Sequence, residues 1–378
     1  MTDRPSVRRF TSGPWKGLVV ALQHRHFDVV TGADTRQIET DTKEMQGITE
    51  GPIFDFARNV MLFSNGEPHR RRRAPIAKSF AFKLMDAMRP RIAALATGLV
   101  TKHLDQGPID FISEIAGQIP HRIIAEILGI PDSDLPVFMR WIADTSKAID
   151  FIPDERRAEI EASLAAFDDY VARLLEERRA APRDDFLSDY VAATAREGLM
   201  CEAEIRAQIV GLIMAGSDTT CGSLCMTFAH LLRNRDQWQA FCADPQGLMR
   251  GAVSEGLRYE PIMSGIPRVA VKDFEIDGCP VQKDSVVVVS LLSALRDPAI
   301  YAEPDRFDIA RDDHPKCHPV FGGGAHRCVG EALARAEMEE TLAVIARLAP
   351  NSELVGRFPR LRPGAIRQID AMQVALKR

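Results

Sequence analysis

Apolar residues recur at helical spacing along most of this 378-residue chain, and the pattern predicts a mainly helical protein. Long helices are expected over residues 133–147, 154–179, 202–232 and 329–348. Short strand-like pieces are expected at 17–22 and 281–292, whereas 1–16 and 43–60 are predicted to be irregular. The pattern therefore favours a mainly α fold with a smaller β region.

A glycine-rich turn delivers one cysteine to the start of the last long helix. The stretch from Phe321 to Gly330 contains three consecutive glycines shortly before Cys328. Unpaired N–H groups at a helix N-terminus favour a thiolate over a thiol, and glycines let the backbone approach a flat ligand closely. We interpret Cys328 as a metal thiolate, although these features alone also fit a helix cap with an ordinary buried thiol.

Polar residues interrupt the most apolar of the predicted helices. Asp218 and Thr219 lie in the middle of the stretch 202–232, where an acid and a hydroxyl are costly unless they have partners. They fit either a local kink, with the hydroxyl bonded back to a carbonyl, or a chain that carries protons to a buried site. Ala215 is small and leaves space beside the helix, and Gly211 lies one turn earlier on the same face.

Composition and charge argue against several classes of protein. The formal net charge is −5, from 48 basic and 53 acidic residues, which does not fit bulk nucleic-acid binding. The seven cysteines are an odd number without paired-ligand spacing, which fits a reducing compartment. The N-terminus has no signal-peptide core, and no apolar run reaches 18 residues. We expect a cytoplasmic protein that binds neither nucleic acid nor a membrane.

The stretch 321–330 resembles the haem-binding loop of the cytochromes P450, Phe-Gly-x-Gly-x-His-x-Cys-x-Gly, and it fills every fixed position. By this resemblance Cys328 is the axial ligand of a haem b iron, and Phe321 and Gly322 contribute to binding the cofactor. The resemblance covers residues 55–370. It implies the cytochrome P450 fold, a triangular prism of helices with the haem between a long distal helix and the helix that follows the cysteine.

The basic run at 69–73 gains a specific meaning from the resemblance. On its own it is typical of a solvated helix face or a nucleic-acid patch. The family carries His-x-x-x-Arg here, which implies that His69 and Arg73, one helical turn apart, bind a haem propionate. Arg268 and His326 match further propionate-binding residues of the family. Five other basic residues are expected near the thiolate face, as a docking patch for an electron donor: Arg70, Arg71, Arg72, Arg327 and Arg335.

Two further motifs resemble those of the family. Glu255 and Arg258 alone are typical of a surface ion pair, but together with Arg306 they look like the buried network that supports the cysteine loop. Asp218 and Thr219 match the oxygen-activation motif, in which the threonine holds a proton-bearing water and the aspartate feeds the relay. Ala215 then borders the cofactor.

We expect a single domain, residues 1–378, with a short β-rich N-terminal part (1–54), a helical part (55–260) and a part with β segments, the cysteine loop and the final helix (261–378). The absent side chain at Gly211 suggests room for a substrate. Candidate residues of an apolar substrate pocket are Gly211, Met214, Ile262, Met263, Ile266, Phe54 and Phe56.

The function that the resemblance implies is a haem-thiolate monooxygenase. Such an enzyme takes two electrons from a separate redox partner, here a ferredoxin with its NAD(P)H-dependent reductase. It activates O2 and inserts one oxygen atom into a small to medium apolar substrate. Two alternatives stay open at this point: a peroxide-driven peroxygenase, and a non-catalytic haem-thiolate binding protein or sensor. Neither would need the pair Asp218 and Thr219.

Overall fold

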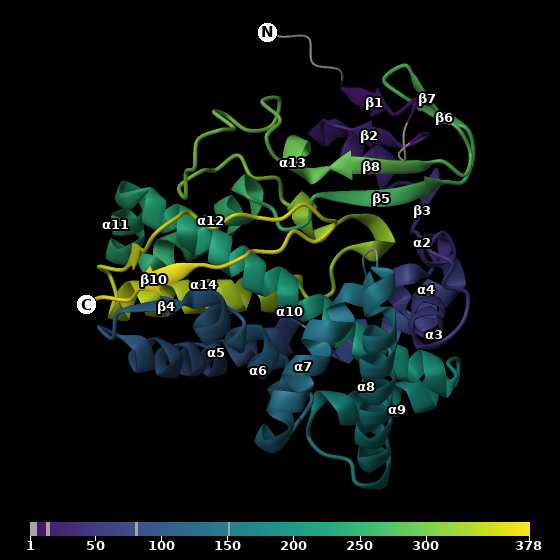
Figure 1. The fold of residues 1–378 in the computed structure, drawn as a ribbon, viewed down its shortest axis with the longest axis horizontal. Helices are drawn as coiled ribbons and strands as arrows, with labels where there is room; N and C mark the ends of the chain where they lie inside the picture. The colour runs from purple at the N-terminus through teal and green to yellow at the C-terminus, as the bar shows by residue number, and fades with distance from the viewer. Residues whose placement is uncertain (1–5, 13–15, 80–81, 150–151) are drawn as a thin grey trace.

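The computed structural model describes residues 6–12, 16–79, 82–149 and 152–378, and helices make up most of it (Figure 1). The longer helices are α3 (Pro52–Asn59), α4 (Gly66–Ser79), α5 (Phe82–His103), α6 (Gln118–Ile127), α7 (Leu135–Thr145), α8 (Asp154–Ala180), α9 (Phe186–Glu197), α10 (Glu202–Arg233), α11 (Arg235–Ala243), α12 (Pro245–Tyr259) and α14 (Glu331–Leu348). Shorter segments are α1 (Phe27–Val30), α2 (Asp41–Glu44), α13 (Leu291–Ala294), and the helical turns η2 (Met61–Phe63) and η3 (Ile112–Ala116).

Helix α10 runs through the middle of the protein, and other helices pack around it (Figure 1). Its first turn is held by a capping box, in which Cys201 and Glu204 bond reciprocally. Most of its residues are buried against α3, α6, α8, α12 and α14, and one hydrophobic cluster joins these helices. Between its two end residues, the exposed residues of α10 are Ala215 and Gly216.

Length and composition alone would allow one described helix, α10, to cross a membrane. More than half of its apolar window, 56%, is buried inside the protein. Burial of this kind is typical of a core helix.

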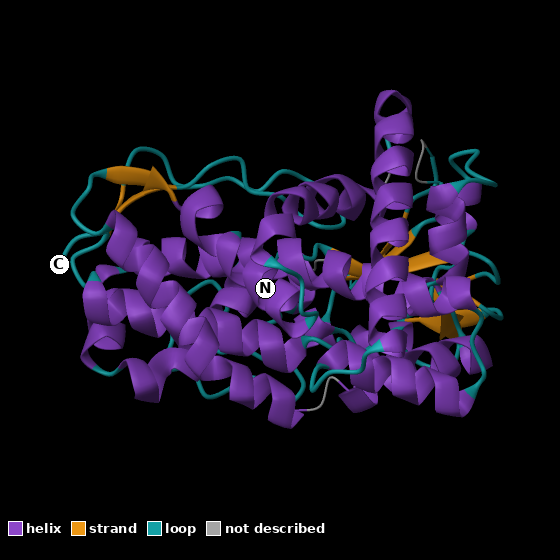
Figure 2. Cartoon of the chain, turned by 90° about the horizontal axis from the view of Figure 1, so that it is seen from below, coloured by secondary structure: helices purple, strands orange, loops and turns teal. Residues whose placement is uncertain are grey.

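The strands form two small sheets and one hairpin. The larger sheet has the order β1 (Val7–Arg9), β2 (Val19–Ala21), β8 (Val286–Ser290), β5 (Gly265–Ala270) and β3 (Thr35–Arg36). Its pairs are antiparallel except β2 with β8, which is parallel. The second sheet has the order β4 (Pro108–Asp110), β10 (Gln373–Ala375) and β9 (Glu353–Leu354), and β6 (Phe274–Ile276) pairs with β7 (Cys279–Val281). The two sheets lie toward opposite ends of the long axis (Figure 2).

The long helices appear where the apolar pattern predicted them, as α7, α8, α10 and α14. Both predictions of irregular structure are wrong in part. Residues 1–16 include β1, which pairs with β2. Residues 43–60 include α3, which begins at Pro52 and buries Ile53 and Phe56. Proline is favourable in the first turn of a helix because its missing N–H has no partner there anyway, so the Gly-Pro sequence begins a helix instead of a loop.

Candidate functional site

The cysteine loop is a tight turn that leads into α14. The Cys328 N–H donates to the Phe321 carbonyl at 2.7 Å and closes the turn. Gly322 has φ +74°, in the left-handed region that favours glycine. A Cβ at Gly323 would come 2.7 Å from the ring of Phe27, so α1 packs directly on the loop. The backbone path therefore depends on glycine, as the sequence predicted.

The surroundings of the Cys328 thiol act on its pKa in opposite directions. Burial raises its pKa and the Glu331 carboxylate raises it further, while the Gly330 N–H and the guanidinium groups of Arg73 and Arg327 lower it without reversing the shift. The N–H group of Gly330 at the start of α14 favours the thiolate, as expected, but desolvation of the thiol acts more strongly in the other direction. Coordination to a metal ion deprotonates a thiol outright. Cys328 therefore fits a metal ligand that becomes a thiolate when the cofactor binds.

Four basic side chains gather beside this loop. The rings of His69 on α4 and His326 on the loop lie 4.0 Å apart. Burial, followed by the neighbouring arginines, lowers the pKa of His69 to about 4. Burial, His69, Arg268 and Arg73 lower the pKa of His326 to about 3. Burial lowers the pKa of Arg268, on β5, to about 10. The sequence-predicted propionate ligands are therefore brought together.

Within the described part of the chain, these four basic groups have no carboxylate partner. Arg73 donates to the Arg327 carbonyl at 2.6 Å, and Arg268 donates to the Pro267 carbonyl at 2.8 Å. The His69 Nε2 is buried without a hydrogen-bond partner. Buried basic groups without a counter-charge select an anion, because an unpaired buried charge is costly. The two propionates of a haem fit this requirement.

The middle of α10 presents small and polar residues next to one another. Ala215 and Gly216 are exposed although they lie in a core helix, and nothing would meet a Cβ at Gly216 within 4 Å. The Thr219 hydroxyl donates to the Ala215 carbonyl at 3.0 Å, and Thr220 donates in the same way to the Gly216 carbonyl at 3.2 Å. Bonding of the hydroxyl back to a carbonyl is one of the two interpretations that the sequence allowed, the other being a chain that carries protons. It leaves the oxygen lone pairs of Thr219 available to accept from a ligand or water.

The candidate substrate residues are only partly brought together. A Cβ at Gly211 would come 2.6 Å from the Val60 side chain, so the space beside Gly211 is filled by protein and not left for a substrate. This corrects the prediction that the missing side chain at Gly211 leaves room for a substrate. Phe56 lies against the same glycine, and Met214 is buried in the hydrophobic core.

The strand-side candidates also pack mainly against protein. Ile262 is buried and lies where a Cβ at Gly222 would touch it at 3.0 Å. Ile266 belongs to the hydrophobic cluster under the larger sheet, and Met263 is partly buried against that cluster. Phe54 is partly buried against the main core.

A buried ion pair supports the segment before the cysteine loop. Arg258 donates to both carboxylate oxygens of Glu255, at 2.6 and 2.8 Å, and both side chains are fully buried. The remaining Arg258 N–H groups donate to the carbonyls of Leu295, Pro304 and Arg306 at 2.8–3.0 Å. A buried pair of this kind holds the segment in place only because every polar group is paired.

The prediction for Arg306 is wrong. Its side chain is 57% exposed and pairs with Glu303, so only its backbone carbonyl joins the network. The second arginine is Arg311, whose side chain is 5% exposed and lies 3.3 Å from the Glu255 carboxylate. Arg306 lies within the Pro-Asp-Arg-Phe segment, and Arg311 follows that segment by a few residues. Sequence spacing gave no sign of which one turns inward.

We predict that Arg311→Ala lowers the free energy of unfolding by roughly 3 kcal/mol, because it leaves part of a buried carboxylate charge uncompensated. The matched control Arg306→Ala removes an exposed arginine side chain that lies outside the buried network, and it should change the free energy of unfolding by about 0.5 kcal/mol or less. Urea unfolding followed by circular dichroism measures both. Equal losses for the two variants would contradict the assignment of Arg311.

The basic patch is smaller than predicted. Arg71 and Arg72 both pair with Glu204 on α10, and Arg72 is buried. Arg327 and Arg335 both pair with Glu331. Arg70 is exposed and has no ion pair within the described residues. The arginines at 71 and 72 therefore join α4 to α10 instead of facing solvent.

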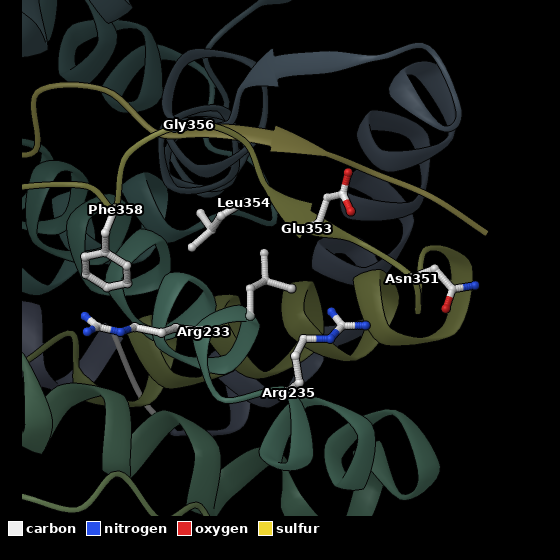
Figure 3. Close-up of a pocket in the computed structure, with 8 residues that line it drawn as sticks. Arg233, Arg235, Asn351, Glu353, Leu354, Gly356 and Phe358 are labelled. Atoms are coloured by element: carbon white, nitrogen blue, oxygen red, sulfur yellow. The ribbon is translucent and has the colours of Figure 1, made fainter.

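Two surface cavities lie outside the basic cluster. A cavity of about 470 Å³ opens at the end of α10, where Arg233 lies 5.0 Å over the Phe358 ring and Leu354 also contributes to the wall (Figure 3). None of the predicted site residues lines it. A second cavity, about 320 Å³, lies between α3, α8 and α10 and is lined in part by Phe56 and Val210.

Comparisons with known proteins agree on one family. The family model described as Cytochrome P450 matches residues 133–242 and 247–347. The plant-inducible cytochrome P450-pinF1 of Rhizobium radiobacter is 38% identical over 99% of this chain and 87% of its own. Luteothin monooxygenase of Streptomyces thioluteus is 32% identical over 83% of this chain and 77% of its own.

Solved structures give the same result for the fold. The crystal structure of CalO2 has a TM-score of 0.89 at 28% identity and covers 98% of this chain and 92% of its own. The cytochrome P450 enzyme CxnD, titled as an enzyme for C–S bond formation in chuangxinmycin biosynthesis, has a TM-score of 0.86 at 28% identity and covers 98% and 91%.

Proposed function

This chain belongs to the cytochrome P450 family and is a haem-thiolate monooxygenase, and we propose that it binds haem b through Cys328 and inserts one oxygen atom from O2 into a small to medium apolar organic substrate. The observation that carries the proposal is a cluster of four basic groups beside Cys328, two of them buried and two half-buried, which have no carboxylate partner within the described residues. The haem would supply oxygen activation. A single domain spanning 1–378 is supported by the coverage of CalO2.

We propose that His69, Arg73, Arg268 and His326 bind the propionates. Each can donate to a carboxylate, and two buried propionates would offset the positive charge that otherwise disfavours the protonated histidines. Phe321 and Gly322 would border the haem on the cysteine side, and Ala215 would border it on the α10 side. The exposure of Ala215 and the backbone path at Gly322 support these roles.

Thr219 and Asp218 are proposed to move protons. The Thr219 Oγ1 already donates to the Ala215 carbonyl, so its oxygen is free to accept from a proton-bearing water. Asp218 lies next to it on α10 and would replace the proton that is used. Thr219 and Asp218 favour the O2-dependent reaction over a peroxide-driven one, which could work without a relay.

The substrate is proposed to be apolar. Phe56 and Val210 line a cavity at one side of α10, and Asp168 and Arg206 form an ion pair of 2.8 Å within the same lining. A cavity lined by apolar side chains and by an ion pair fits an organic molecule of low charge. Spectral shifts of the ferric protein on titration with a compound library would identify the substrate class.

Electrons are proposed to come from a ferredoxin and its NAD(P)H-dependent reductase in the cytoplasm. Arg70 is exposed on α4, whose Arg73 reaches the cysteine loop through the Arg327 carbonyl. An exposed cation near this loop would attract an acidic electron donor. The seven cysteines are free, which supports a reducing compartment.

We predict that Cys328→Ala abolishes the thiolate-type Soret band of the ferrous carbon monoxide complex, because no sulfur remains to ligate the iron. Absorption spectroscopy of the purified variant, reconstituted with haem, measures this. Gly330→Ala, two residues away, serves as the control for local disturbance and should keep the band. An unchanged band in Cys328→Ala would exclude this cysteine as the ligand.

We predict that Thr219→Ala keeps substrate-induced spectral shifts but diverts electrons to hydrogen peroxide, because the hydroxyl that positions the proton is gone. The yield of peroxide per NADH should rise several-fold, as loss of a proton-transfer group typically costs roughly 10²-fold or more in the step it serves. The control is Thr220→Ala, which removes a buried hydroxyl with the same backbone bond one residue later. Equal uncoupling in both variants would point to a general disturbance of α10.

We predict that Arg70→Glu slows reduction by ferredoxin at low ionic strength, with little effect at high salt. Attraction between exposed charges falls as the Debye length shrinks from about 10 Å at 0.1 M to about 3 Å at 1 M. Stopped-flow reduction under carbon monoxide measures the rate. Arg183→Glu, an exposed arginine in the connection between α8 and α9, is the control for net charge. Insensitivity to both salt and Arg70→Glu would place docking elsewhere.

A further inference from the structure

His121 on α6 is a half-buried histidine that no motif of the sequence includes. Both of its ring nitrogens are buried, and neither has a hydrogen-bond partner within the described part of the chain. Buried polar atoms are almost always paired, so an unpaired ring in a protein core calls for a physical explanation. The helix on which it lies packs directly against α10.

The crossing of the two helices brings His121 toward Asp218. A Cβ at Gly117, at the start of α6, would lie 3.8 Å from the Cys221 sulfur on α10. His121 is one turn further along α6, and Asp218 is one turn back from Cys221. The Asp218 carboxylate acts on the imidazole: burial lowers the pKa of His121, and Asp218 raises it in part.

Asp218 is the one charge that acts on His121 in this way. Charged groups on the other elements around α6 have ion-pair partners of their own. Arg91 on α5 pairs with Glu126 on α6, and Glu114 in η3 pairs with Lys102 and His103. Asp144 on α7 pairs with Lys147, and Glu339 and Glu340 on α14 pair with Arg89. On α6 itself, Arg122 bonds to the Gln118 side chain. Burial raises the pKa of Glu337 on α14 well above its usual range, which favours the neutral carboxyl.

Asp218 for its part has no hydrogen bond or ion pair to any residue that the structure describes. An acid and a histidine on two packed helices, each without another partner, form a natural pair. We propose that His121 is the positioning residue of Asp218: a ring N–H that has no partner in this structure donates to the carboxylate from the α6 side once haem is bound, and fixes the orientation from which Asp218 passes a proton toward Thr219. This inference rests on the proposed monooxygenase function.

The pairing gives proton delivery a pH dependence. At neutral pH His121 is uncharged and serves as a hydrogen-bond donor. When the pH falls through its pKa, the imidazolium stabilises the Asp218 carboxylate and makes that group a poorer proton acceptor from solvent. Electrons should then be lost to hydrogen peroxide more often at low pH, with an inflection at the pKa of His121.

The first test needs no turnover. The pKa of His121 is measured by NMR titration of its ring signals in the haem-loaded ferrous carbon monoxide form. In Asp218→Asn that pKa should fall by about one pH unit, because the carboxylate that favours the imidazolium is lost. Arg122→Gln, a charge change next to His121 on the solvent side of α6, should leave it unchanged. An unchanged pKa in Asp218→Asn would overturn the pairing while leaving the proposed function of Thr219 intact.

The second test measures peroxide released per NADH as a function of pH. His121→Phe keeps a ring but removes both nitrogens, so peroxide should increase at neutral pH and the inflection should disappear. His121→Gln keeps an N–H donor and should restore neutral-pH coupling to within about two-fold of the parent, also without the inflection. If Asp218→Asn uncouples the enzyme and His121→Phe does not, the positioning role is excluded. If Asp218→Asn itself fails to uncouple, the proposed relay fails, and the role of His121 fails with it.

Discussion

Four basic side chains from three separate elements lie together beside the cysteine loop, where burial and the neighbouring arginines disfavour further positive charge. Two come from α4, one from β5 and one from the cysteine loop, and the low pKa values of the two histidines record how unfavourable further positive charge is there. The fold must therefore be stable enough elsewhere to keep the cluster in place. A dianionic ligand removes that cost, so binding of the cofactor and folding stability are thermodynamically linked.

Two sets of ion pairs hold the elements around this cluster in place. Behind the cysteine loop, the fully buried pair of Glu255 and Arg258 has all of its strong donors and acceptors engaged, which lets it fix three backbone carbonyls of a long irregular segment. In front, Glu204 both caps α10 and pairs with Arg71 and Arg72. Although burial acts in the other direction, these partners lower the pKa of Glu204. One carboxylate thus ties the helix of the basic cluster to the helix of Thr219.

The sequence was informative where a feature is local. Helical spacing located α8, α10 and α14, and the cysteine loop could be recognised because ten consecutive residues define its turn. Features that depend on tertiary contacts were missed or misassigned. Gly211 looked like open space but is filled by Val60, a residue far away in the chain. Arg71 and Arg72 looked solvated because their partner lies on another helix.

The same reasoning applies to Arg306 and Arg311. One lies in a family-like motif and the other shortly after it, and only the path of an irregular segment decides which side chain reaches Glu255. His121 carried no signal at all, since a single histidine on an amphipathic helix is ordinary in sequence. It becomes informative only when its unpaired nitrogens and its neighbour on α10 are seen together.

The parallel pairing of β2 with β8 has a consequence for how the protein is made. Val19 pairs with Val287, so 268 residues separate the two partners, from 287 − 19. Synthesis at roughly 5–20 residues per second leaves the first strands without their neighbour for about 13–54 s. During that time an apolar strand edge stays open to other chains. The N-terminal strands thus depend on β8 for their place in the sheet, and we expect expression of this protein to respond to chaperone supply and translation speed.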